Sequence, residues 1–290
     1  MKLVTYRDGS AVRHGLLRAD GAEEVVVDLG PGDLLGLLEA GPAALAAARQ
    51  ATGSERPLAA VQLLAPLIRP PKLLALAANY QDHITESGGA PVEKAGLAPK
   101  LFLKPSSAII GPGQPLILPD VSRTVDWELE LAVVIGKRCR NLPADQALDA
   151  VAGYTIINDI SARTVDYGSE RTDYAWREYF DWLMGKWLDG FAPLGPYLLT
   201  ADEVPDPQNL HMQLTVDGKV RQSASTRDMI FGVAEIIAFA SRLMTLEPGD
   251  IIATGTPSGV GDATGTFLQA GNVMEATITG LGTLRTPVQA

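Results

Sequence analysis

The chain is poor in cysteine and histidine: its 290 residues include one cysteine, Cys139, and three histidines. A single cysteine excludes an internal disulfide framework and suits a reducing compartment. Zinc sites draw mainly on cysteine and histidine, so this composition directs any search for a metal site to oxygen ligands.

Long apolar runs and basic charge are scarce as well. No apolar stretch approaches the length of a membrane span, and the opening residues MKLVTYRDGS lack the pattern of a secretory signal, so we expect a cytoplasmic protein with no membrane partner. A net charge of −10 argues against a nucleic-acid partner, because such binding needs concentrated Lys and Arg. An acidic protein that binds a small anion needs local positive charge, and a bound cation would supply it.

Turn-forming residues are abundant, with 29 glycines and 20 prolines, and 46% of the residues are hydrophobic. This composition predicts a globular α+β protein rich in short strands. Residues 1 to about 30 are expected to form hairpins, and residues 33–51 have helical spacing. Arg69-Pro70-Pro71 interrupts regular structure, which predicts a small N-terminal domain at 1–70 and a larger domain at 71–290.

The larger domain is predicted to consist mostly of strands. One clear helix is expected from about Met229 to Met244, before the turn at Pro248-Gly249-Asp250. The expected strands are Lys72 to Ala77, Leu101 to Lys104, Val125 to Ile135, Gly153 to Asp159, Leu210 to Val216, Asp250 to Ala253 and Val273 to Ile278.

The segment from Val125 to Ile135 carries three acidic residues at alternate positions. In a strand, Asp126, Glu128 and Glu130 would project from one face and repel each other unless water or a cation neutralises them. A solvated acidic face is the simpler interpretation for such a strand. The apolar residues that follow on the same face oppose it, because they indicate partial burial, and buried unpaired carboxylates are costly.

A second acidic residue, Asp159, lies near the end of another apolar strand, in Ile156-Ile157-Asn158-Asp159. Glu128, Glu130 and Asp159 together form a set of hard oxygen ligands. Such a set suits Mg²⁺ or Mn²⁺, would also accept Ca²⁺, and does not suit zinc.

The histidine with the best case for chemistry is His83. If Tyr80 to Glu86 forms a helical turn, His83 and Glu86 stand at i and i+3, where the carboxylate can orient the imidazole and raise its basicity. Such pairs are also common on solvated helices. The run from Gly88 to Lys100 resembles a mobile loop that can close over a site, and this favours a catalytic dyad.

Two lysines, Lys104 and Lys186, lie among apolar or aromatic residues. Either can pair with a substrate carboxylate or a developing enolate. The alternative for each is a surface lysine whose stem lies on apolar neighbours.

Several ordered blocks between about Lys72 and Gly261 resemble the fumarylacetoacetate hydrolase family. They are Asn79-Tyr80-x-x-His83-x-x-Glu86, Lys104-Pro105-Ser106, Asp126-x-Glu128-x-Glu130, Asn158-Asp159-Ile160-Ser161-Ala162-Arg163, Gly185-Lys186, Pro193-Leu194-Gly195-Pro196, Ser225-Thr226-Arg227-Asp228 and Thr254-Gly255-Thr256-Pro257.

The resemblance implies a role for each matching residue. Glu128, Glu130 and Asp159 would bind the metal, His83 with Glu86 would activate water on a lid, and Lys186 would face the oxyanion. The residues that would bind or border the substrate are Arg163, Lys104, Ser225, Thr226 and Thr256.

The resemblance also implies a mixed β-roll catalytic fold, a homodimer and Mg²⁺ or Mn²⁺. Related members hydrolyse diketo acids, decarboxylate oxaloacetate or isomerise hydroxydienedioates. The chain reads Thr164-Val165-Asp166 where members often differ, and the insert from Gly168 to Leu183 is expected to reshape the pocket rim.

We therefore expect a metal-dependent hydrolase that cleaves a C–C bond in a small diketo acid, such as an acylpyruvate, through an enolate. The alternatives are an isomerase or decarboxylase of 2-oxo or hydroxydiene dicarboxylic acids on the same site. A non-catalytic protein that uses the ion structurally is a third class, and it would leave the pairing of His83 with Glu86 unexplained.

Overall fold

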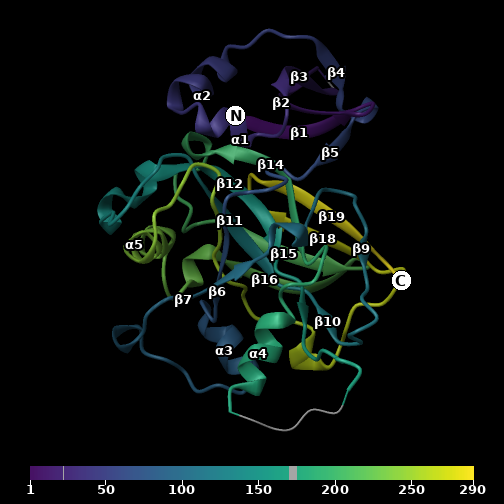
Figure 1. The fold of residues 1–290 in the computed structure, drawn as a ribbon, viewed down its shortest axis with the longest axis vertical. Helices are drawn as coiled ribbons and strands as arrows, with labels where there is room; N and C mark the ends of the chain where they lie inside the picture. The colour runs from purple at the N-terminus through teal and green to yellow at the C-terminus, as the bar shows by residue number, and fades with distance from the viewer. Residues whose placement is uncertain (22, 170–174) are drawn as a thin grey trace.

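The computed structural model describes residues 1–21, 23–169 and 175–290 (Figure 1). Strands dominate these residues and form one large sheet of 12 strands, in which β5 (Gln62–Leu64) pairs with β1 and β8 (Ile109–Ile110) pairs with β14. Across the sheet the remaining strands are β4 (Glu55–Pro57), β3 (Glu23–Pro31), β2 (Ala11–Asp20), β1 (Lys2–Asp8), β14 (Ala192–Thr200), β12 (Val151–Asn158), β11 (Leu129–Ile135), β17 (Ile251–Ala253), β6 (Leu73–Ala77) and β7 (Lys100–Lys104).

A second sheet of five strands packs against the first, with β15 next to β11, β18 next to β12 and β19 next to β14. A two-stranded pair, β10 with β13, lies apart from both sheets. The strands of the second sheet and of the pair are β16 (Lys219–Ser225), β15 (His211–Val216), β18 (Val273–Ile278), β19 (Gly282–Gln289), β9 (Leu116–Ile117), β10 (Val125–Asp126) and β13 (Ser161–Ala162).

The helices are short and lie at the periphery of the sheets. Figure 1 shows α3 and α4 at the end of the molecule opposite the N-terminal strands. No helix among the described residues is long and apolar enough to cross a membrane. The α-helices are α1 (Leu35–Glu39), α2 (Pro42–Arg49), α3 (Gln81–Glu86), α4 (Arg177–Met184) and α5 (Val233–Leu243); the 3₁₀ helices are η1 (Leu58–Ala60), η2 (Lys94–Gly96), η3 (Ser106–Ala108), η4 (Ala144–Ala150), η5 (Ala201–Glu203), η6 (Thr226–Asp228) and η7 (Asp262–Thr264).

The β-rich α+β fold predicted from composition is confirmed. The N-terminal hairpins and the helix before Pro248 are also present, and α5 begins where the Glu235 side chain accepts a hydrogen bond from the Gly232 N–H at 2.8 Å. The large sheet runs across the predicted domain boundary near residue 70, because β1 pairs with β14 through Lys2 opposite Leu199 and Leu3 opposite Leu198.

The single strand expected from Val125 to Ile135 was wrong, because the structure has two strands, β10 and β11, with Trp127 and Glu128 between them. The backbone there bonds to side chains in place of a neighbouring strand. The Glu128 N–H donates to the Asn158 side chain at 2.8 Å, and the Leu129 N–H donates to the Gln222 side chain at 2.9 Å. The chain therefore leaves regular strand structure at Trp127 and Glu128, within the acidic motif.

The junction between β1 and β14 gives a stability prediction. Leu198 is fully buried opposite Leu3, so Leu198→Ala should lower the free energy of unfolding by about 2–5 kcal/mol through lost burial and a residual cavity. Leu103→Ala is the control, because Leu103 is 51% exposed and should change little. Urea denaturation measures the free energy of unfolding of both variants. Equally small decreases in the two variants would contradict a core that is continuous across β1 and β14.

Candidate active site

Three buried carboxylates meet at one point, as the sequence predicted. Glu128, Glu130 and Asp159 each place one oxygen so that the three atoms lie within 4.8 Å of one another. Glu130 lies on β11, Asp159 follows β12, and the Asp159 N–H donates to the Glu128 carbonyl at 2.8 Å. Antiparallel pairing of β11 with β12 thus brings residues about thirty positions apart to one site.

Two buried lysines neutralise part of this charge. The Lys186 Nζ donates to Glu128 at 2.7 Å and to Asp159 at 2.8 Å. The Lys104 Nζ donates to the other oxygen of Asp159 at 2.5 Å and to the Ile160 carbonyl at 3.2 Å. Both ammonium groups pair with carboxylates that would otherwise be buried without partners.

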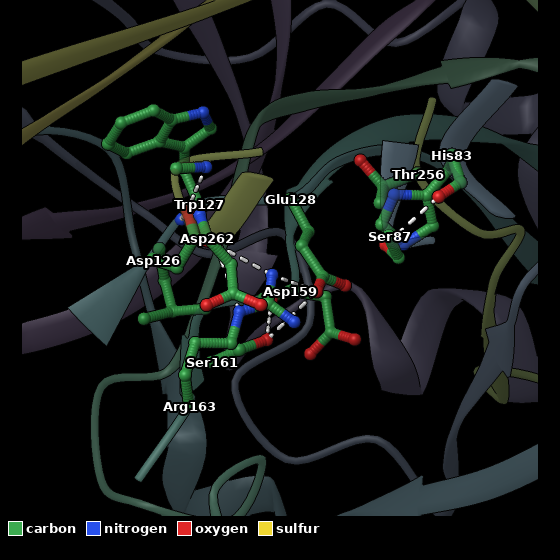
Figure 2. A network of polar contacts seen from close by, with 12 residues as sticks. His83, Ser87, Asp126, Trp127, Glu128, Asp159, Ser161, Arg163, Thr256 and Asp262 are labelled. Atoms are coloured by element: carbon green, nitrogen blue, oxygen red, sulfur yellow. Dashed lines mark hydrogen bonds and ion pairs between the residues drawn. The ribbon is translucent and has the colours of Figure 1, made fainter. Parts of the chain in front are cut away.

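Arg163 adds a third cation and is itself held by Asp126. One Asp126 oxygen accepts from the Arg163 Nε at 2.9 Å and Nη2 at 2.7 Å, and the same Nη2 donates to Glu128 at 2.8 Å. The Asp126 carboxylate also accepts the backbone N–H groups of Gly261 and Asp262. In the view of Figure 2, Glu128 and Asp159 lie between this pair and His83.

The carboxylates do not share these cations equally. Burial alone would raise the pKa of Glu128, but Lys186, Arg163 and His83 outweigh burial and lower its pKa to about 2. Burial raises the pKa of Glu130 well above its ordinary value, and repulsion from Asp159 and Glu128 adds to the rise. Glu130 accepts one backbone hydrogen bond, from the Gly255 N–H at 2.7 Å, and among the described residues it forms no ion pair.

This imbalance fits a divalent metal ion. A buried carboxylate whose charge is not matched gains most from a cation nearby, and all three ligand groups offer hard oxygen atoms. The site can therefore hold a divalent metal ion through Glu128, Glu130 and Asp159.

The predicted dyad forms on α3. The His83 Nδ1 lies 2.9 Å from one Glu86 oxygen, and the other Glu86 oxygen accepts the Gly259 N–H at 2.8 Å. Their side chains are 15% and 18% exposed, so solvent reaches both. When the Nδ1–H of His83 donates this hydrogen bond to the Glu86 carboxylate, the Nε2 carries the lone pair.

A cavity of about 320 Å³ joins the dyad to the metal ligands. His83, Glu128, Asp159, Arg163, Lys186 and Thr256 all line it. Trp182 of α4 forms part of its wall, where its ring meets Phe102 edge-on at 5.0 Å, and Lys186 lies 5.5 Å from the Phe102 ring centroid. The aromatic setting predicted for Lys186 is therefore present. Residues 170–174 of the expected insert lie outside the described residues.

Other predicted substrate contacts lie elsewhere. Lys104 is buried behind Asp159, with no exposed side-chain surface. The Ser225 hydroxyl accepts the Arg227 N–H, and the Thr226 hydroxyl accepts the Leu210 N–H, so both serve the turn into η6 and neither lines the cavity. Their substrate roles stay predictions, as does the mobility of the loop from Gly88 to Lys100.

Asp126 and Trp182 had no role assigned from sequence. Asp126 belongs to the same acidic motif as Glu128 and Glu130, so that motif could have identified it as a residue of the site. Nothing in the spacing of the motif predicts that its partner is Arg163. Trp182 falls in the segment that was expected only to reshape the pocket rim, and the sequence offers no signal that its ring faces Phe102.

Fold and site together define a β-rich enzyme class with a carboxylate triad suited to a metal ion. The profile described as Fumarylacetoacetate (FAA) hydrolase C-terminal matches residues 72–289, and the profile described as Rv2993c-like, N-terminal matches residues 1–66. The chain therefore belongs to the fumarylacetoacetate hydrolase family, as its motifs predicted.

Its relatives carry names from different reactions. Human mitochondrial oxaloacetate tautomerase FAHD2A is 39% identical over 98% of this chain and 90% of its own length. The solved fumarylacetoacetate hydrolase of Exiguobacterium antarcticum has 35% identity and a TM-score of 0.80, covering 100% of this chain and 99% of that one. The 2-hydroxyhepta-2,4-diene-1,7-dioate isomerase of Mycobacterium marinum has 32% identity and a TM-score of 0.76, covering 100% and 98%.

The unbalanced charge on Glu130 predicts opposite effects of one substitution. The pKa of Glu130 is higher in the folded protein than in the unfolded chain, so the unfolded chain gives up the Glu130 proton at lower pH. The free energy of unfolding of the metal-free protein therefore falls as pH rises above the ordinary value of 4.5. Glu130→Gln removes that loss and should raise Tm in EDTA at neutral pH. The same change should weaken Mn²⁺ binding by at least about tenfold, because a ligand is lost.

Thermal melts between about pH 5 and 8 and calorimetric titration with Mn²⁺ measure the two effects. Glu275→Gln is the control, since Glu275 is exposed on β18 and should change neither. A Glu130→Gln protein that melts lower in EDTA and binds Mn²⁺ normally would contradict the assignment.

Proposed function

We propose that the protein is a Mg²⁺- or Mn²⁺-dependent isomerase that moves a proton beside the carbonyl of a small 2-oxo dicarboxylic acid, as in keto–enol tautomerisation. The observation that carries the proposal is that His83, oriented by Glu86, lines the same cavity as Glu128 and Asp159. The names of the oxaloacetate tautomerase and heptadienedioate isomerase relatives support this choice of reaction.

The ion would be held by Glu128, Glu130 and Asp159, and when bound it supplies Lewis acidity toward the 2-oxo and carboxylate oxygens of a substrate. Lys186 and Arg163 line the cavity beside these ligands and offset negative charge that develops on the substrate. The Trp182 ring lines the cavity beside them, and its apolar surface excludes water there.

The Nε2 of His83 takes the proton from the carbon next to the 2-oxo group and returns it to the oxygen or to a carbon further along. Glu86 stabilises the imidazolium that forms between these two transfers. The Gly259 N–H holds the far oxygen of Glu86, so the dyad keeps its orientation while the proton moves. One base that gives back the proton it takes is sufficient for an isomerase.

Hydrolysis of a C–C bond in a diketo acid is the second candidate. The same dyad can activate water, and the fumarylacetoacetate hydrolase from Exiguobacterium supports this reading by its name and fold. Hydrolysis needs a water molecule and a distal carbonyl in addition to the proton transfer. A panel of oxaloacetate and acylpyruvates, followed by NMR with Mg²⁺ present, separates the two: enol and keto forms interconvert in one case, and two fragments appear in the other.

The dyad gives a direct test. His83→Ala should lower the rate of oxaloacetate tautomerisation by about 10²–10⁴-fold through loss of the base, while Mn²⁺ affinity stays unchanged. Enol absorbance against time measures the rate. His211→Ala is the matched control, because His211 is exposed on β15 and does not line the cavity. Full activity in the His83→Ala protein would rule out the proposed base.

A further inference from the structure

Three side chains on one face of β7 point toward the site. Lys100, Phe102 and Lys104 occupy alternate positions of this strand and therefore share a face. Lys104 reaches Asp159, and Phe102 lies beside Lys186. Lys100, at the start of the strand, lines the same cavity at its exposed end. The strand thus runs from the metal ligands to the mouth of the cavity.

Lys100 differs from the other cations of the cavity in having no carboxylate partner. Arg163 is bound by Asp126 and Glu128, and Lys186 is bound by Glu128 and Asp159. Within 1–21, 23–169 and 175–290, no ion pair or hydrogen bond occupies the Lys100 ammonium group. Such a cation, facing a cavity, can pair with a charge that a ligand brings.

The wall beside Lys100 leaves room for that ligand. Lys100 stands opposite Ala77 in the pairing of β6 with β7, and Ala77, Ala78 and Ser87 line the cavity there. None of these three side chains is bulky or acidic. A ligand that extends from the metal ligands toward the mouth therefore meets a lysine flanked by small residues.

We propose that Lys100 is a specificity-determining residue that pairs with the far carboxylate of a 2-oxo dicarboxylic acid of five or more carbons. This rests on the proposed function, since it takes the 2-oxo acid end to lie at the triad. The backbones of Lys100 and Lys104 stand about 13 Å apart along the strand, and side chains of a strand stand roughly perpendicular to it. A far carboxylate that reaches Lys100 therefore has to be carried away from the 2-oxo acid group by a carbon chain, which favours an extended diacid of five or more carbons over a four-carbon one.

The test uses two ligands that differ only at the far end. 2-Oxoadipate and 2-oxohexanoate have the same six-carbon chain and the same 2-oxo acid group, and the second lacks the far carboxylate. Calorimetry on the Mn²⁺-loaded protein should give a Kd about tenfold lower for 2-oxoadipate. Lys100→Met should abolish that preference, and Lys100→Glu should reverse it. Lys137→Met is the control, because Lys137 is exposed at the far end of β11 and should retain the preference.

Three results would overturn the assignment: a preference that survives Lys100→Met, an equal loss of affinity for both ligands, or no binding of either ligand. Loss of the protons next to the 2-oxo group in D₂O, followed by NMR, tests the proposed function separately. Wild-type protein that binds with the Lys100-dependent preference and catalyses no exchange would refute the isomerase and keep the lysine assignment. Proton exchange by a wild-type protein that shows no preference for 2-oxoadipate would support the isomerase and refute the lysine assignment.

Discussion

The arrangement of the site depends on one constraint, which is that four carboxylates are buried side by side in the interior of a β-rich protein. Removing a carboxylate from water is costly unless cations or hydrogen bonds replace the water. Three cations face the four acids, which leaves one negative charge unmatched, and burial together with repulsion from Asp159 and Glu128 raises the pKa of Glu130. A divalent ion would turn this excess into a net positive charge. That change would supply the local positive charge that the proposed anionic substrate needs in a protein with net charge −10. The charged residues are Asp126, Glu128, Glu130, Asp159, Lys104, Lys186 and Arg163.

The backbone accommodates the cluster by leaving the regular sheet. All residues of β11 are buried, and Glu130 is one of them. Just before β11 the chain departs from the ladder at Trp127 and Glu128, and the side chains of Asn158 and Gln222 accept the N–H groups of Glu128 and Leu129. Gln222 also donates to Thr256 at 2.8 Å, and the Thr256 hydroxyl donates to the Leu129 carbonyl at 3.0 Å. Polar side chains thus replace strand pairing at Glu128 and Leu129, next to the cavity wall.

Local patterns were sufficient for some parts of this site and not for others. The alternation of acidic residues predicted that Glu128 and Glu130 would converge, which they do although Glu128 lies outside the strand, and the i, i+3 spacing predicted the pairing of His83 with Glu86. The pairing of Arg163 with Asp126 depends on how β10 and β13 meet, which no local pattern contains. The strand β14 was not anticipated, because prolines and glycine in Ala192–Thr200 resemble a break. Its central place between β1 and β12 comes from tertiary pairing, which overrides the local signal.

The two halves of the cavity are held in different ways, and this bears on why one fold serves several reactions. The metal ligands lie in the buried interior, fixed by strand pairing and by ion pairs. His83 lies on a short, partly exposed helix. Asn79, two residues before that helix, is anchored by hydrogen bonds between its side chain and the backbone of Thr254 and Phe231. The half that holds the metal ligands is therefore buried and paired on several sides, whereas α3, α4 and the start of β7 lie at the edge, where substitutions cost little stability. Under the proposed function, a change of reaction or of substrate length needs changes only at that edge, because the metal ligands stay the same while residues such as His83 and Lys100 would meet the rest of the substrate.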